Sequence, residues 1–346
     1  MKSKRSALWA VVVGVVIAPF VAEAPPRAFG EAAATAPADT TLHRRCQLAY
    51  VLLWSKDFDA AIAEFDKALR VDGSYNDARL GRGLALERKG DLDAALKEYE
   101  RVEADSPQHA DAMAGRARIL VSRGQFEEAI KLYEALKEKT LLTDASRLAF
   151  VEALAYDRQY ERALAELEPL RRVAPMAAEV AKTEGQILAW SGRSEEAIPK
   201  LQEALKNDPT DDKVRMDLAT SLFLANQHDK AVETLKGLSP AMADDPQVIA
   251  LKTDILVSAR RYDDAIKMLD EAIAAHPDAT HLKLRKAEIL SWNQRYDESI
   301  AVYRQILQAE PDNQDVRGRL AEVLMWAGRF EEAAQEYRRA LGEANP

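Results

Sequence analysis

The sequence predicts an all-α protein, a solenoid of nine helix–turn–helix repeats, because one pattern recurs every 34 residues from Leu42 onward without insertion. The repeats begin at residues 42, 76, 110, 144, 178, 212, 246, 280 and 314. A small residue fills one column nine times: Ala61, Ala95, Ala129, Ala163, Ala197, Ala231, Ala265, Ser299 and Ala333. A bulky residue fills a second column nine times: Phe65, Tyr99, Tyr133, Leu167, Leu201, Leu235, Leu269, Tyr303 and Tyr337. Such units bury their apolar faces by stacking, so residues 42–346 are expected to form one stack.

Each repeat is expected to hold two helices that fold back on one another. A mostly small residue in the first helix would allow close approach to the alanine of the second: Ala49, Gly83, Ala117, Val151, Gly185, Ala219, Thr253, Ala287 and Ala321. Turns with glycine separate the helices, since glycine readily takes the left-handed conformation that ends a helix. An acidic residue then opens the second helix, where the helix dipole favours it: Asp59, Asp93, Glu127, Glu161, Glu195, Asp229, Asp263, Asp297 and Glu331. Proline closes five repeats: Pro107, Pro175, Pro209, Pro277 and Pro311.

Two stretches carry the pattern most clearly, Gly-Asp-Leu-Asp-Ala-Ala-Leu-Lys-Glu-Tyr at 90–99 and Gly-Arg-Phe-Glu-Glu-Ala-Ala-Gln-Glu-Tyr at 328–337. With the columns above, they make residues 42–346 resemble the tetratricopeptide repeat family. The resemblance implies a right-handed superhelix whose inner groove is lined mainly by the first helix of each repeat. It also implies a scaffold that binds other molecules in that groove.

The first 41 residues follow a different pattern, one that is typical of export. Lys2, Lys4 and Arg5 precede an apolar run at residues 7–22, the charge and length profile of a secretory signal. Its 16 residues are fewer than the roughly 20 that span a bilayer as a helix. We expect residues 1–24 to be a signal peptide or an uncleaved N-terminal anchor, and residues 25–41 to be an Ala/Pro-rich linker. Either way the repeats would lie outside the cytoplasm, in a periplasm-like compartment.

Charge and cysteine content narrow the possible partners. Four of the 48 basic and three of the 57 acidic residues precede Leu42, so the repeats carry 44 basic against 54 acidic residues. This acidic surface without a basic stripe does not suit nucleic acid. The single cysteine, Cys46, forms no intramolecular disulfide, and is expected to be a small packed residue unless it pairs with another chain.

No catalytic or cofactor-binding motif stands out in the sequence. The spacings of the five histidines along the sequence do not match those of a metal site: His43, His109, His228, His276 and His281. Neither a glycine-rich phosphate loop nor a nucleophile elbow is present. Charged residues make up 30% of the chain, so neighbouring carboxylates are expected on solvated helix faces. The sequence therefore predicts a protein without enzymatic activity, cofactor or metal.

One column departs from plain repeat packing and forms the predicted groove-binding site. It lies at the end of the first helix and holds Trp54, Tyr156, Trp190, Trp292 and Trp326. One helical turn earlier the same repeats hold Tyr50, Glu152, Gln186, Glu288 and Glu322. In the family that the chain resembles, the aromatic column faces the inner groove. Packing against the next repeat would explain it equally, and both roles are compatible where one ring face stays open. If the column binds, we expect binding at the two tryptophan-bearing ends of the stack.

Aromatic rings beside carboxylates and amides suit either a peptide with basic residues or a sugar. Protein or peptide partners in an envelope assembly are the first interpretation. A glycan-binding role in polysaccharide synthesis or export is the second, because Leu-Leu-Trp-Ser at 52–55 and Leu-Met-Trp-Ala at 324–327 loosely resemble exported bacterial repeat proteins of exopolysaccharide assembly. A self-assembling rod, joined through an uncapped C-terminal repeat, is the third.

Residues 178–245 are expected to be the least stable part of the stack. Pro199 lies inside a predicted second helix, where it removes one backbone hydrogen bond and kinks the chain. Ser194 and His228 replace the aromatic residue or leucine that fills their column in the other repeats.

The mature chain is predicted to begin between residues 25 and 31, because the basic start and apolar run direct export and the Ala/Pro segment is accessible to a peptidase. Mass spectrometry of the native protein tests this directly. Recovery of a soluble cytoplasmic form that retains Met1 would contradict it.

Overall fold

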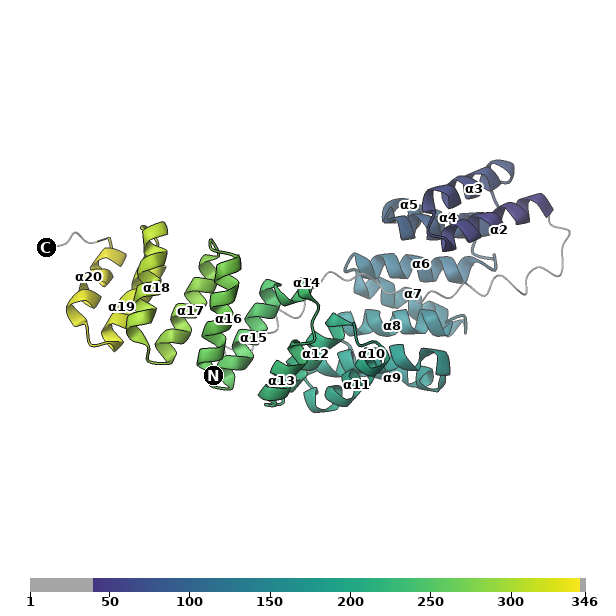
Figure 1. Ribbon diagram of the computed structural model, residues 1–346. Helices are drawn as coiled ribbons and strands as arrows, with labels where there is room; N and C mark the ends of the chain where they lie inside the picture. The colour runs from purple at the N-terminus through teal and green to yellow at the C-terminus, as the bar shows by residue number, and fades with distance from the viewer. Residues whose placement is uncertain (1–39, 343–346) are drawn as a thin grey trace. The chain divides into compact units, whose positions relative to one another are not determined.

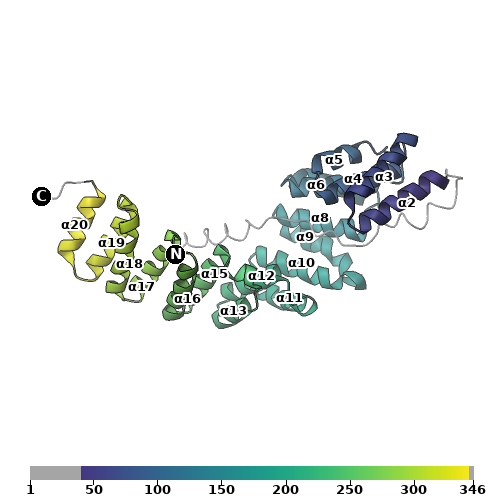
Figure 2. The same cartoon turned by 45° about the horizontal axis from the view of Figure 1, so that its top comes forward.

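The computed structural model describes residues 40–342, and over this range the chain forms helices and turns without strands. Figures 1 and 2 show helices that follow one another as packed pairs. The all-α repeat fold predicted from the 34-residue period is confirmed. The expected signal peptide, and the linker up to residue 39, lie outside the described residues. The first helix begins at Thr40, so the last two residues of the expected linker are helical.

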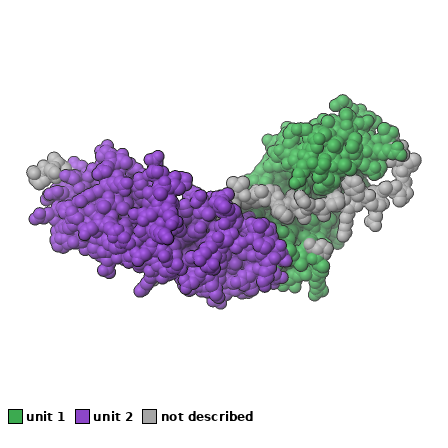
Figure 3. Space-filling view, viewed as in Figure 1, with its two compact units in different colours: residues 1–187 green, residues 188–346 purple. Residues whose placement is uncertain are grey.

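The chain divides into two compact units, residues 1–187 and 188–346 (Figure 3). In the first unit the first helices of the repeats are α2 (Thr40–Trp54), α4 (Asn76–Lys89), α6 (His109–Ser122) and α8 (Asp144–Tyr156). Their second helices are α3 (Phe58–Val71), α5 (Leu92–Glu100), α7 (Phe126–Glu138) and α9 (Tyr160–Leu167). Two short 3-10 turns follow, η3 (Glu168–Arg172) and η4 (Ala174–Met176).

The division between the units falls inside α10 (Ala177–Trp190), the first helix of the fifth repeat. In the second unit α11 (Ser194–Asn207) completes that repeat. The later first helices are α12 (Asp212–Leu224), α15 (Pro246–Ser258), α17 (Thr280–Trp292) and α19 (Gln314–Trp326). The later second helices are α13 (His228–Leu235), α16 (Tyr262–Ala275), α18 (Tyr296–Ala309) and α20 (Phe330–Ala340), with the one-turn helix α14 (Pro240–Ala243) after α13.

The residues of the two small columns are buried, and side chains of the bulky column pack between the helices that carry them. All nine members of each small column are buried. Tyr99 on α5 shows the arrangement: a Cβ on Gly83 of α4 would lie 2.7 Å from one edge of its ring, and a Cβ on Gly115 of α6 would lie 2.5 Å from the other. The ring therefore packs against the first helix of its own repeat and that of the next. Where Ser299 replaces the alanine, its hydroxyl donates a 2.7 Å hydrogen bond to the Ala287 carbonyl and is satisfied.

The turn between the two helices has a left-handed residue in all nine repeats. Glycine supplies it in four: Gly90, Gly124, Gly192 and Gly328. In the other five a residue with a side chain adopts a φ of 59–64°: Lys56, Arg158, Asn226, Arg260 and Gln294. A side chain costs about 1–2 kcal/mol in this conformation, so the packing of the helix pair imposes the turn even where the sequence does not favour it.

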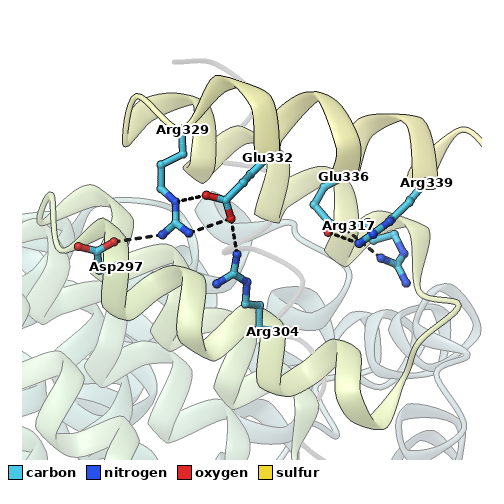
Figure 4. Close-up of polar contacts among 7 residues, drawn as sticks. All are labelled: Asp297, Arg304, Arg317, Arg329, Glu332, Glu336 and Arg339. Atoms are coloured by element: carbon cyan, nitrogen blue, oxygen red, sulfur yellow. Dashed lines mark hydrogen bonds and ion pairs between the residues drawn. The ribbon is translucent and has the colours of Figure 1, made fainter. Parts of the chain in front are cut away.

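The acidic column does more than favour the helix dipole. Its members lie in the first turn of each second helix as predicted, and five of them also pair with a basic residue of the next repeat: Asp59–Lys89, Asp93–Arg123, Asp229–Arg261, Asp263–Arg295 and Asp297–Arg329. Figure 4 shows Arg329 joining Asp297 of the preceding repeat to Glu332 of its own helix, and Arg304 reaching the same Glu332 at 2.7 Å. These pairs are exposed, so each contributes at most about 1 kcal/mol.

A column of arginines also joins successive repeats, a role that was not predicted from the sequence. Arg79, Arg215 and Arg317 each donate to the carbonyl at the end of the preceding repeat. For Arg317 the acceptor is the Pro311 carbonyl at 2.6 Å, and Glu336 holds the same guanidinium at 2.9 Å. Arginine at the fourth place of five of the nine repeats was the signal available in the sequence.

The features expected to weaken residues 178–245 are present, although the proline does not interrupt its helix. Pro199 is the sixth residue of α11, which continues from Ser194 to Asn207. His228 packs edge-on to Phe223 with ring centroids 5.7 Å apart, and its Nδ1 is buried without a hydrogen-bond partner. The helix that it begins, α13, is only eight residues long.

Residues 178–245 should therefore exchange their amide hydrogens before the rest of residues 76–309. Replacing His228→Phe should stabilise this segment by about 1 kcal/mol, because it removes a buried unsatisfied nitrogen and restores the aromatic residue of the column. The matched reverse change, Tyr262→His, should weaken α16 by a similar amount. Hydrogen exchange followed by mass spectrometry measures both, and uniform protection from the fourth to the seventh repeat would contradict the prediction.

Candidate functional site

The predicted aromatic column lies at the end of the first helices. Trp54, Tyr156, Trp190, Trp292 and Trp326 are the last residues of α2, α8, α10, α17 and α19. Their exposure divides them into two groups. Trp54, Tyr156 and Trp190 are partly buried, whereas Trp292 and Trp326 keep 42% and 49% of their surface exposed.

In the first unit the aromatic members of the column are held by packing. Trp54 lies against the buried cluster of α2 and α3, and its indole Nε1 is buried without a hydrogen-bond acceptor. The Tyr156 ring lies 5.8 Å from that of Phe126, at an angle of 33°. Trp54 is therefore poorly placed to bind a ligand. Of the two ends of the stack at which binding was expected, the C-terminal end keeps exposed tryptophans and the N-terminal end does not.

Tyr50, predicted to line the groove, and Cys46, expected to be a small packed residue, are both part of the core. Tyr50 is 5% exposed, packs edge-on against Phe65 at 5.1 Å, and donates a 3.2 Å hydrogen bond to Asp77. The prediction that Tyr50 lines the groove is wrong, because a ring at this place in the first repeat turns inward onto Phe65. Cys46 is buried beside it, and burial raises the pKa of its thiol to about 12, so it is not a reactive thiolate at neutral pH.

The other polar members of the site also differ in exposure. Gln186 is buried and Glu152 half-buried, and both take part in interactions of their own. Glu288 is half-buried and Glu322 is exposed. Of the predicted site residues, Trp292, Trp326 and Glu322 are exposed and Glu288 is half-buried, and all four lie on α17 and α19, the first helices of neighbouring repeats.

An alternating row of charges crosses those first helices. Asp254 on α15 pairs with Arg285 on α17, Arg285 lies 3.3 Å from Glu288 one turn later, and Glu288 pairs with Arg319 on α19. The Arg285 guanidinium also lies over the Trp292 ring, 5.1 Å from its centroid. This distance is within the range of a cation–π interaction. Burial and then Glu288 raise the pKa of Tyr303, behind the row, to about 12, so its hydroxyl remains protonated at neutral pH.

A buried counterpart of this row lies in the first unit. Arg118 on α6 donates two 2.9 Å hydrogen bonds to the two carboxylate oxygens of Glu87 on α4. The Tyr99 hydroxyl donates a third, at 2.6 Å. Burial alone would raise the pKa of Glu87, but the Arg118 charge and these hydrogen bonds outweigh burial and hold it below its usual value. The cluster joins the second repeat to the third through side chains that are 9% (Glu87) and 20% (Arg118) exposed, which indicates a structural role.

Within residues 40–342 no group of three or more His, Cys, Asp or Glu side chains is arranged to hold a metal ion. None of the helices in that range is both long and apolar enough to cross a membrane.

Over residues 40–342, nine pairs of helices that recur with a 34-residue period and a common set of packing columns define a helical repeat scaffold. Two family models, both described as tetratricopeptide repeat, match it: one over residues 86–141, 190–255, 256–303 and 293–346, the other over 46–110 and 148–212. The chain belongs to the tetratricopeptide repeat family. Members of this family are typically non-catalytic and commonly serve as scaffolds for protein partners.

Solved structures are similar to the chain in fold. A tetratricopeptide repeat protein from Parabacteroides merdae is 13% identical, covering 72% of this chain and 98% of its own, with a TM-score of 0.49. Human IFIT1, crystallised as a dimer with PPP-AAAA, is 19% identical over 87% of this chain and 72% of its own, with a TM-score of 0.47. YrrB, described as having an unusual peptide-binding site, is 22% identical over 49% and 88%, with a TM-score of 0.40. A search of the curated proteins finds no match.

Glu87→Gln should lower the stability of α4 to α6 by about 3 kcal/mol at pH 7, because it leaves the Arg118 charge without its counter-ion. The folded pKa of Glu87 lies below the unfolded value of about 4.3, so its stabilisation is present above that pH and is lost as the pH falls through the folded pKa. The variant should therefore lose less stability than the wild type on acidification below about pH 4. Hydrogen exchange of α4 and α6 at several pH values measures both effects.

The control for this prediction is Glu196→Gln, which removes a carboxylate from an exposed pair with Arg193. It should change stability by less than about 1 kcal/mol. Equal effects of the two substitutions would show that the buried cluster contributes no more to stability than an exposed ion pair does.

Proposed function

We propose that this protein is an exported, non-catalytic scaffold that binds protein partners, as part of an envelope assembly, through the first helices of its repeats. The observation that carries the proposal is the exposure of Trp292 and Trp326 at the ends of α17 and α19. Large aromatic side chains dominate the binding energy of many protein interfaces, and ordinary packing would bury them. Export is supported by the basic start and apolar run of residues 1–22.

A protein ligand has more support than a glycan because of the charges around the tryptophans. Glu288 is held by Arg285 and Arg319, and the Trp292 ring is covered on one face by the Arg285 guanidinium. An alternating row of fixed charges complements a chain that carries charged side chains of its own, which neutral sugars lack.

Two alternatives keep a specific observation in their favour. The exposed Trp326 ring beside the exposed Glu322 carboxylate also suits a sugar, which stacks its C–H face on the ring and donates hydroxyls to the acceptor. Self-association is favoured by exposed apolar side chains on α20 and directly after it. Phe330 is 66% exposed and Leu341 is 72% exposed. Exposed apolar side chains at this place would suit a helix from a second copy.

Replacing both Trp292→Ala and Trp326→Ala should reduce affinity for the partner at least about tenfold, the equivalent of 1.4 kcal/mol. A photo-crosslinking amino acid at position 326, compared with one at exposed Glu331 on α20, identifies the partner in the envelope fraction; its affinity is then measured by calorimetry. Helicity should be unchanged, since both rings are exposed. Crosslinks equal at both positions, or unfolding of the last repeats while a Trp→Phe pair binds normally, would reduce the column to a packing feature.

A further inference from the structure

The last two described first helices carry the same three residues at the same spacing. On α17 these are Arg285, Glu288 and Trp292, and on α19 they are Arg319, Glu322 and Trp326. On α17 the three act as one group, because the guanidinium lies 5.1 Å from the ring centroid and 3.3 Å from the carboxylate of its own helix. The chain thus shows how a guanidinium is held by a tryptophan and a glutamate at this place in a repeat.

On α19 the arginine is engaged elsewhere. Arg319 pairs with Glu288 of the preceding repeat, and its charge lies close enough to the Tyr303 hydroxyl to oppose the rise that burial causes in the pKa of that group. Across residues 40–342 Glu322 has no ion pair and the Trp326 ring has no cation over it, and both side chains are exposed. The alternating row therefore runs acid, base, acid, base, and ends on the unmatched carboxylate of Glu322.

We propose that Trp326 and Glu322 form a receptor for an arginine side chain of the protein partner. This inference rests on the proposed function and specifies the chemistry of its ligand. An arginine fits better than a lysine, because a planar guanidinium can stack on the indole while its N–H groups donate to a carboxylate. The net charge of −9 attracts a basic partner from a distance.

The test uses the full chain labelled with 5-fluorotryptophan, which gives one fluorine signal for each of the five tryptophans. The probe is the peptide acetyl-Gly-Arg-Gly-amide, compared with the same peptide in which neutral citrulline replaces arginine. The arginine peptide should shift the Trp326 signal, assigned with Trp326→Phe, in a saturable way. The citrulline peptide should bind at least about tenfold more weakly, because it keeps the shape and loses the charge.

Glu322→Gln should weaken the arginine peptide about fivefold, since it removes the charge partner and leaves the ring. The matched control is Glu331→Gln, an equal loss of charge at an exposed place on α20, and it should leave binding unchanged. Both positions are exposed, so both variants should fold, as thermal unfolding will verify.

Equal binding of the arginine and citrulline peptides, or equal binding by the two glutamine variants, would overturn the inference. So would a Trp326 signal that responds to cellotetraose and not to the arginine peptide, which would favour the glycan alternative. If partner binding depends on the two tryptophans and the arginine peptide does not bind, only this inference fails. If the peptide binds and partner affinity is unaffected by the tryptophan variants, the proposed function fails instead.

Discussion

The fit of one bulky side chain between the first helices of two successive repeats is the constraint on which the structure depends. Tyr99 illustrates it, because its ring occupies space that a methyl group on either Gly83 or Gly115 would take away. Small residues let the helix backbones approach, and the ring then fills what remains between them. The spacing of the repeats, the closeness of the helix pairs and the left-handed turns all follow from repeating this contact.

The polar atoms of the bulky column give these contacts a second role. The Tyr99 hydroxyl donates to Glu87, and the Tyr303 hydroxyl lies near the charges of Glu288 and Arg319, so each tyrosine adjoins an ion pair that crosses to the next repeat. In the first unit this pair is buried and structural. In the second unit it lies among exposed side chains next to Trp292. The same chemistry therefore supports packing in one place and borders a candidate binding face in the other.

The helical pairs, their boundaries and both small columns could be predicted from the sequence, because each depends on residues within a single 34-residue period. The left-handed conformation of the five non-glycine turns could not, since Lys56 or Arg260 adopts it only because the packed helices require it. The exposure of the aromatic side chains could not be predicted from the sequence either. Trp54 and Trp326 occupy the same place in the pattern, but Trp54 lies against the α2–α3 cluster while Trp326 remains open. Ion pairs such as Asp297–Arg329 were also missed, because they join residues 32 apart in sequence through side chains that compete for several partners.

The pairing of neighbouring repeats also bears on how such a protein changes length. Asp229–Arg261, Asp263–Arg295 and Asp297–Arg329 are the same connection made three times, and each arginine also holds an acid three residues further along its own helix. A duplicated 34-residue segment placed among them would present a matching acid at one end and a matching arginine at the other. Gene duplication can therefore lengthen this part of the chain in whole repeats and keep this ion pair at each new junction.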